Sequence, residues 1–480
     1  MKKAAILILI LCFALGGVLA YFRLCPRMPE LPAQTPETEK APPEAEPIAP
    51  PPRHPWEPTV TETETARKGR TVSLRQYDFE NGDRVQMYRL TGGETVLWCG
   101  ELPSDAVIHY YSAAEEMWLH ELPEARVYDT DIVAVEAAGR SLMFCSPKTY
   151  RRLEGKVICH LPSENGGLSA ERTENGWKLS LCGNAENGDF CDALVLSWSG
   201  VLDWEISNDA VAWQKYLTEG KWCFDGYYYT APSTYEPSGE NCYYRCPASY
   251  IVNVSVTRCR QCPEARPLSV ALLDTVARAQ NERGFWATDA RSSWLYTDYG
   301  IDSGFYDTRF NTDLMEIYVR ANDALGGGLF TDTIQRYLEF YTELTQRTHR
   351  ETENGGWMIP DYWHTEIRET PHTSLNHQAA ECLTLYHIAD LLEDEGARAL
   401  ADRLLRGIED TADGFVNWDH NLHYAYLNNG TYGLRDYPEL TYNDLLALQR
   451  YLGTPNEKLQ LLMDEKRQWM DNNSVTWYNR

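Results

Sequence analysis

The first half of the chain alternates hydrophobic and polar residues in short segments. Alternation with a period of two is typical of strands that bury one face. The clearest segments lie at 84–90, 94–99, 141–145 and 177–182. Pairs typical of hairpin turns separate or flank them: Asn81-Gly82, Gly92-Gly93 and Asn187-Gly188. The pattern therefore predicts a β-rich domain over residues 67–264, built as a sandwich or a stack of sheets.

The period changes to that of helices from Pro267 onward. Leu268, Leu272 and Val276 begin a series of apolar residues spaced three or four apart. Helices are predicted at 312–322, 331–346, 374–393, 397–411, 442–452 and 457–469. Helices joined in antiparallel pairs, with long aromatic loops at one end, resemble an α/α toroid. We therefore expect a catalytic α/α toroid-like domain over residues 265–480, in which loops and inner helix ends wall a cleft.

The N-terminus has the pattern of an export signal. Lys2 and Lys3 precede an apolar run from Ala4 to Phe22, and the run is nearly long enough to span a bilayer. Because residues 16–20 form a poor cleavage site, we expect a signal anchor at 1–23 that is retained. Proline-rich sequence then predicts a disordered linker over 24–66. These features predict a single-pass membrane protein whose bulk is extracytoplasmic, or a secreted protein if the N-terminus is cleaved.

Charge narrows the list of partners. The net charge is -26 and the isoelectric point is about 4.8. Such a chain repels phosphate backbones, so nucleic acid is not expected as a partner. An anionic polysaccharide would be repelled as well unless the binding site gathers its own cations.

Cysteine is abundant in the β-rich region. The chain has 13 cysteines, and ten of them lie between Cys99 and Cys262. Together with an export signal, this density favours disulfides. The spacing of Cys242, Cys246, Cys259 and Cys262 is also compatible with a zinc site, and buried thiols are a third interpretation.

The first candidate cluster for chemistry surrounds the predicted helix start near residue 310. Arg309 offers a planar fork suited to a carboxylate, and Asp307 lies two residues before it. Asn311 or Thr312 is equally suited to cap the helix. We therefore list Asp307 and Arg309 as candidate substrate-binding residues.

The second cluster contains aromatic and histidine residues. Trp357, Tyr362 and His364 precede the predicted helix at 374–393 and are candidate substrate-binding residues. His377 and Glu381 lie four apart and share one helix face, so they form an acid/base pair, metal ligands or a structural pair. His364, His372 and His377 match no tight metal motif.

The third cluster precedes the predicted helix at 442–452. Pro438 favours an extended residue at position 437, so Tyr437 and Glu439 are expected at the cleft end of this helix. An elaborate helix cap with Tyr437 packed against the helix is the structural alternative.

The sequence contains no Gly-rich phosphate loop, no Gly-x-Ser-x-Gly and no His-Glu-x-x-His, and we expect neither a cofactor nor a metal.

The C-terminal half resembles the C-terminal domain family of D-glucuronyl C5-epimerases, over about residues 285–452. The resemblance rests on Gly355-Gly356-Trp357, on the polar helix start at 374–378, and on the segment from Asp436 to Gln449. The family inverts C5 of glucuronate within a polysaccharide, with tyrosines as acid/base residues. Its further segment Tyr-Glu-Glu-Tyr-Pro has no clear counterpart here.

The resemblance implies roles for particular residues. Tyr437 matches the late catalytic tyrosine of the family, and Tyr424 (or Tyr426) approximates the tyrosine upstream. Arg309 and Arg435 become candidates for holding the uronate carboxylate. Glu439 and His377 complete the candidate catalytic set, and Tyr442 joins the candidate binding residues.

These observations predict a uronic-acid C5-epimerase acting on an extracellular or cell-surface polysaccharide. A lyase, which begins with the same proton abstraction, is the nearest alternative and would use Tyr437 with His377. A glycoside hydrolase would need two carboxylates, such as Asp361 and Glu439. A glycan-binding envelope protein without catalysis is the fourth possibility.

Overall fold

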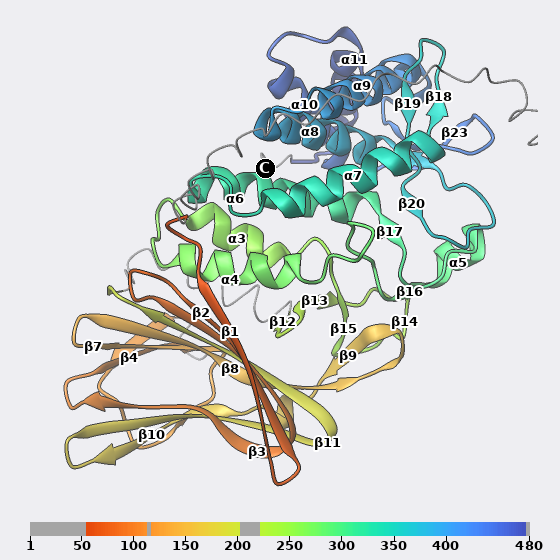
Figure 1. The fold of residues 1–480 in the computed structure, drawn as a ribbon. Coiled ribbons are helices and arrows are strands. Elements are labelled where there is room, and N and C mark those ends of the chain that lie inside the picture. The colour runs from red at the N-terminus through yellow and green to blue at the C-terminus, as the bar shows by residue number, and fades with distance from the viewer. Residues whose placement is uncertain (1–53, 113–116, 202–220, 477–480) are drawn as a thin grey trace, which may run out of the picture. The chain divides into compact units, whose positions relative to one another are not determined.

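The computed structural model describes residues 54–112, 117–201 and 221–476 (Figure 1). The predicted anchor at 1–23 and most of the predicted linker at 24–66 lie outside these ranges. Within them, no helix is both long enough and apolar enough to cross a bilayer. A β-rich part precedes a helical part, as the sequence predicts.

One antiparallel sheet, whose strands differ widely in length, forms most of the β-rich part. Its central path runs β1-β2-β3-β11-β8-β9-β15-β13-β12 in the described residues, and β4, β5, β6, β7 and β10 attach beside it. Its strands are β1 (Thr59–Arg67), β2 (Arg70–Asp78), β3 (Arg84–Pro103), β4 (Val107–Ser112), β5 (Met117–Glu121), β6 (Val127–Tyr128), β7 (Ile132–Ala137), β8 (Arg140–Arg152), β9 (Val157–His160), β10 (Gly167–Thr173), β11 (Gly176–Trp198), β12 (Lys221–Cys223), β13 (Gly226–Thr230) and β15 (Cys242–Arg245).

Two sequence-based expectations about these strands are wrong. Residues 59–66 belong to β1 and not to the linker, because alternating threonines there pair along β2. The Gly92-Gly93 and Asn187-Gly188 pairs do not separate strands either: β3 and β11 run through them and bend together at a register shift. A side chain at Gly92 would meet the carbonyl oxygen of Gly69 at 2.2 Å, so glycine there permits close packing of the β1–β2 turn.

Helices form the rest of the chain. They are α3 (Tyr250–Arg258), α4 (Ala265–Ala277), α5 (Ser293–Tyr299), α6 (Thr308–Leu325), α7 (Thr331–Thr348), α8 (Leu375–Leu392), α9 (Glu395–Phe415), α10 (Leu440–Leu452) and α11 (Glu457–Asn472). Short strands lie between them: β14 (Tyr235–Glu236), β16 (Arg291–Ser292), β17 (Tyr306–Asp307), β18 (Arg350–Glu351), β19 (Trp357–Met358), β20 (Tyr362–Trp363), β21 (Thr373–Ser374), β22 (His423–Tyr426) and β23 (Tyr432–Arg435).

The long helices pack in two rows. Helix α8 contacts α6 and α10, and α9 contacts α7 and α11, while α8 also packs on α9 (Figure 1). Helix α8 has buried residues along nearly its whole length, as expected for the helix at the centre of this packing. Such paired helices agree with the layout expected of a toroid. The helical part begins at Tyr250, earlier than the predicted boundary at 265.

The sheet and the helices share one hydrophobic core. Leu268 and Leu272 of α4 line the same small cavity as Met143 and Leu194 of β8 and β11. The cluster of buried side chains extends from Tyr77 in the sheet to Met470 in α11. The β-rich part is therefore packed directly against the helical part.

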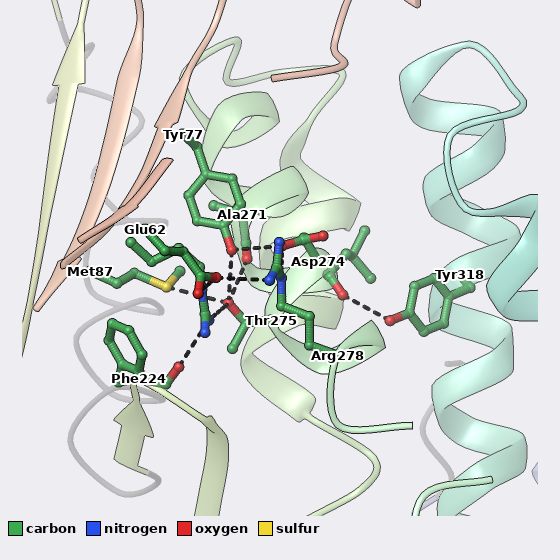
Figure 2. A network of polar contacts seen from close by, with 11 residues as sticks. Glu62, Tyr77, Met87, Phe224, Ala271, Asp274, Thr275, Arg278 and Tyr318 are labelled. Carbon is green, nitrogen blue, oxygen red and sulfur yellow. Dashed lines mark hydrogen bonds and ion pairs between the residues drawn. The ribbon is translucent and has the colours of Figure 1, made fainter. Parts of the chain in front are cut away.

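Polar contacts reinforce this interface (Figure 2). The Tyr77 hydroxyl donates to Asp274 on α4 at 2.8 Å, and Arg75 lies in an ion pair with Glu62 of β1 at 2.8 Å. Arg278, just after α4, also pairs with Glu62 at 2.8 Å. The β1–β2 hairpin is thus tied to α4 by both charge and hydrogen bonds.

The eleven described cysteines are free thiols. The disulfides favoured by the sequence are therefore not formed among the described residues. No group of three or more metal-ligating side chains is found in those residues either. Cys259, one of the four cysteines with zinc-like spacing, instead lies near Ser269, with 3.3 Å between sulfur and hydroxyl.

Candidate active site

Short strand pairs bring the N-terminal ends of α6 and α8 together. Strand β17, which leads into α6, pairs with β20, and the Thr308 amide donates to the Asp361 carbonyl at 3.0 Å. The Asp361 amide in turn donates to the His372 carbonyl at 2.9 Å. Strand β21, which leads into α8, pairs with β22 and so adds Tyr424. Chemically active residues far apart in the sequence therefore meet at one place.

Asp361 lies at the centre of this cluster and is fully buried. Its carboxylate accepts a hydrogen bond from the Ser374 amide at 2.7 Å and another from the Ser374 hydroxyl. Burial opposes its charge, but His377, His372 and Ser374 outweigh burial and hold the pKa of Asp361 below its usual range. The N-terminus of α8 favours the same anion. Asp361 is therefore a carboxylate fixed in place.

His372 connects Asp361 to a tyrosine that sequence analysis missed. Its Nε2 lies 3.3 Å from the Asp361 carboxylate, and its Nδ1 lies 2.7 Å from the hydroxyl of Tyr299 at the end of α5. His372 is 2% exposed, whereas Tyr299 is half-buried. Burial raises the pKa of Tyr299 above its ordinary value. His372 therefore lies between Tyr299, to which it is hydrogen-bonded, and Asp361, which is within ion-pair distance of its Nε2, although that nitrogen makes no hydrogen bond in the described residues.

His377 approaches Asp361 from the other side. Its Nδ1 lies 2.7 Å from the Thr308 hydroxyl and 3.6 Å from the Asp361 carboxylate. Burial lowers the pKa of His377 to about 4, despite the attraction of Asp361, so the imidazole is neutral at neutral pH. Glu381, one turn along α8, accepts a hydrogen bond from the Tyr341 hydroxyl at 2.6 Å. Burial raises the pKa of Glu381 to about 8.

Tyr424 and Tyr437 lie together at the open side of the cluster. Their ring centroids are 5.6 Å apart, and Tyr424 is 5.7 Å from His372. Tyr437 is 50% exposed, so a ligand can reach it. Burial and nearby carboxylates raise the pKa of both tyrosines, so each carries its proton at neutral pH. We call Tyr299, His372, Tyr424 and Tyr437 the aromatic row.

Asp307 is a second buried carboxyl group near the aromatic row. It caps α6 by accepting a hydrogen bond from the Phe310 amide at 3.0 Å. Burial raises its pKa to about 7, and the charge of Asp361 adds to the effect. Asp307 is one of the substrate-binding residues predicted from the sequence, and that role stays a prediction.

Arg309 is already engaged within the protein. Its guanidinium donates to Asp313 at 2.9 Å and forms a bidentate pair with Asp444 of α10, at 2.6 and 3.2 Å. This pair joins α6 to α10 and is largely buried. These contacts give Arg309 a structural role between α6 and α10. Its predicted contact with a uronate carboxylate stays a prediction.

Arg350 is a cation of this region that sequence analysis missed. Its guanidinium donates to the carbonyls of Leu427, at 3.0 Å, and Pro371. In the described part of the chain its Nε has no hydrogen-bond partner. Arg350 is close enough to Asp361 and Tyr299 to interact electrostatically with both, although burial lowers its own pKa.

A buried ion pair fixes the backbone beside Tyr437. Lys466 of α11 donates to Asp436 at 2.6 Å, to the Tyr437 carbonyl at 2.7 Å and to Asn421 at 2.7 Å. Both charged side chains are at most 1% exposed. Asp436 therefore orients the segment that carries Tyr437, and Lys466 is a positioning residue absent from the sequence-based list.

The remaining predicted residues lie around the cluster or away from it. Tyr362 is buried, with its ring 6.2 Å from His377, and His364 accepts from the Glu366 amide within a turn at 3.1 Å. Trp357 is stacked on His349 at 3.8 Å in the packing between β19 and α9.

The residues beside Tyr437 differ in exposure. Arg435 is exposed on β23, and Glu439 is partly exposed at the start of α10. Tyr442 is 1% exposed and its hydroxyl accepts from Arg467, so it packs between α10 and α11. Burial of this kind gives Tyr442 a packing role in the structure.

No protein-family model matches the chain, and no curated protein matches it. Among solved structures, D-mannose isomerase matches with 12% identity over 49% of this chain and a TM-score of 0.37. This chain covers 63% of the length of that protein.

Two further solved structures match. A family 76 glycoside hydrolase from a bovine Bacteroides thetaiotaomicron strain matches with 9% identity over 87% of this chain and 78% of its own, at a TM-score of 0.38. Cellobiose 2-epimerase from Bacillus thermoamylovorans B4167 matches with 14% identity over 56% of this chain and 72% of its own, at a TM-score of 0.37. These similarities establish no activity for this chain.

Proposed function

We propose that the chain is a carbohydrate-active enzyme with an α/α toroid-like domain that epimerises C5 of a uronic acid within a polysaccharide. The observation that carries the proposal is the contact between Tyr424 and Tyr437, with ring centroids 5.6 Å apart beside the buried Asp361. Both tyrosines are predicted from the sequence, and the fold brings them together. A site for proton abstraction and return needs such acid/base groups at one sugar.

The charges of the site bear on the substrate. Arg309 is held by Asp444 and Asp313, which leaves Arg350 and the exposed Arg435 as candidates for the uronate carboxylate. Arg350 lies near Asp361 and Tyr299 and makes no ion pair among the described residues. A cation there would stabilise the enediolate that forms when the C5 proton leaves.

The same observations weigh against paired-carboxylate hydrolysis. Asp361 is fully buried and its oxygens already accept from Ser374. A general acid or base must reach the glycosidic oxygen or an attacking water. Asp361 is therefore a supporting group and not one of a pair of hydrolytic carboxylates.

Deuterium incorporation from D₂O tests the proposal. Purified protein is incubated with glucuronate-containing polysaccharides, and C5 deuterium and new chain ends are measured. We expect C5 exchange without cleavage, and a loss of about 100-fold or more in Tyr437→Phe and Tyr424→Phe. Tyr451→Phe is the matched control, because Tyr451 bonds Asp390 at the opposite end of α10. Exchange accompanied by unsaturated chain ends would establish a lyase instead, and exchange unchanged in both variants would refute the assignment.

A further inference from the structure

The proposed reaction needs a base as well as an acid. Burial raises the pKa of Tyr424, Tyr437 and Tyr299 alike, so each holds its proton at neutral pH, and a tyrosine here can act as the base only where a neighbouring group accepts its proton. Among the described residues, neither the Tyr424 nor the Tyr437 hydroxyl is hydrogen-bonded to a histidine or a carboxylate that could take its proton. A residue that accepts the C5 proton is therefore still required.

We propose that Tyr299 is this base, with His372 as its proton acceptor and Asp361 as the anion that stabilises the protonated histidine. The inference rests on the proposed function and adds a catalytic residue to it. Its basis is the chain of contacts from the Tyr299 hydroxyl to His372 Nδ1, at 2.7 Å, and from His372 Nε2 to the Asp361 carboxylate, at 3.3 Å.

The ionisation of Asp361 decides which nitrogen of His372 carries the proton. His372 Nε2 lies 3.3 Å from the Asp361 carboxylate and makes no hydrogen bond in the described part of the chain; because a carboxylate only accepts hydrogen bonds, its proximity favours the hydrogen on Nε2. Neutral imidazole then has a lone pair at Nδ1, where the Tyr299 hydroxyl donates. This is the arrangement by which a histidine and a buried carboxylate activate a neighbouring hydroxyl.

The position of Tyr299 fits a reacting group. It is half-buried, whereas His372 and Asp361 are buried, so the tyrosine lies at the outer end of the chain of contacts. Its ring centroid is 5.8 Å from that of His372, which is itself 5.7 Å from Tyr424. The aromatic row therefore has Tyr299 at one end and Tyr437 at the other, with His372 and Tyr424 between them.

The proton transfers balance as follows. The Tyr299 hydroxyl proton moves to His372 Nδ1 while the phenolate oxygen takes the C5 proton, and the C–H electron pair enters the enediolate of the uronate. The Tyr424 hydroxyl, which belongs to the tyrosine next to His372 in the aromatic row, then gives its proton to the opposite face of C5. The imidazolium proton of His372 returns through solvent to the Tyr424 phenolate, which restores the starting state.

Two measurements test this inference. In the first, C5 deuterium exchange is compared between Tyr299→Phe and the control Tyr296→Phe, an exposed tyrosine one turn earlier on α5. We expect Tyr299→Phe to lose about 100-fold or more in rate with polysaccharide binding unchanged, and the control to match the wild type. His372→Asn should cause a similar loss but none beyond it in the Tyr299→Phe background, because the two residues act as one unit.

The second measurement needs no substrate. Nitrogen-15 NMR of histidine-labelled protein, assigned with His372→Asn, reports the tautomer of His372. Hydrogen on Nε2, and an Nδ1 resonance that shifts in Tyr299→Phe, support the inference; hydrogen on Nδ1 overturns it. Exchange in the wild type with an unaffected Tyr299→Phe variant also overturns it and leaves the proposed function standing. No exchange by the wild type on any polymer counts against the proposed function, and the tautomer then decides the inference alone.

Discussion

Glu381→Gln tests the electrostatics of the site without a substrate. Glu381 is 2% exposed, and burial raises its pKa to about 8 from an ordinary value of 4.5. Native protein therefore binds more protons than unfolded protein between these values. Stability from this group is fully present below about pH 4.5 and is lost as pH rises through about 8. Glutamine keeps the acceptor for Tyr341 and removes the titration.

The magnitude follows from the two pKa values. Each pH unit between them changes the free energy of unfolding by about 1.4 kcal/mol. The advantage of Glu381→Gln over the wild type in free energy of unfolding should grow by about 2–3 kcal/mol as the pH rises from about 5 to about 7. Near pH 4 the advantage should be small. The gain arises because unfolded wild-type protein releases the proton that the native state retains.

Urea denaturation at several pH values, followed by tryptophan fluorescence, measures this difference. Glu343→Gln, on the exposed face of α7, is the matched control for loss of a glutamate. Equal slopes in the two variants are needed to compare midpoints. Parallel stability curves for wild type and Glu381→Gln, or a variant less stable at neutral pH, would refute the argument.

Two further predictions concern packing. Lys466→Met should lower the free energy of unfolding by about 3–5 kcal/mol in urea denaturation, because Asp436 is left as a buried unpaired charge; adding Asp436→Leu should restore much of this loss, and additive losses would contradict the explanation. Gly407→Ala should lower it by about 1–3 kcal/mol, because the new Cβ would lie 2.3 Å from the Trp357 carbonyl oxygen. Gly396→Ala on the same helix is the control, and equal melting temperatures for the two variants would count against the close approach.

The helices were largely predictable because their apolar spacing is regular. The segments predicted at 331–346 and 457–469 match α7 and α11 in their starts and differ by a few residues at their ends. The sheet was less predictable. Glycine pairs in β3 and β11 have the sequence signature of turns, yet cross-strand pairing carries both strands through them. Local sequence does not specify which strand a residue meets.

The candidate site was likewise predictable only in part. Tyr424 and Tyr437 were identified from local sequence, and the fold brings them into contact. Tyr299 was not, because it ends a short helix without a recognisable motif and acquires its partner, His372, only through tertiary structure. Lys466 likewise belongs to a helix whose sequence shows only a charged, amphipathic pattern, and its burial depends on the loop that reaches it from Asp436.

The joint between the β1–β2 hairpin and α4 limits how this protein can be divided. Leu268 and Leu272 pack toward Met143 and Leu194, and Tyr77 donates to Asp274 across the same boundary (Figure 2). A fragment that begins at residue 265 would expose the apolar side chains of Leu268 and Leu272 on its first helix. Chimeras between related proteins, whether made in the laboratory or by natural recombination, would therefore have to exchange the sheet and the helices together.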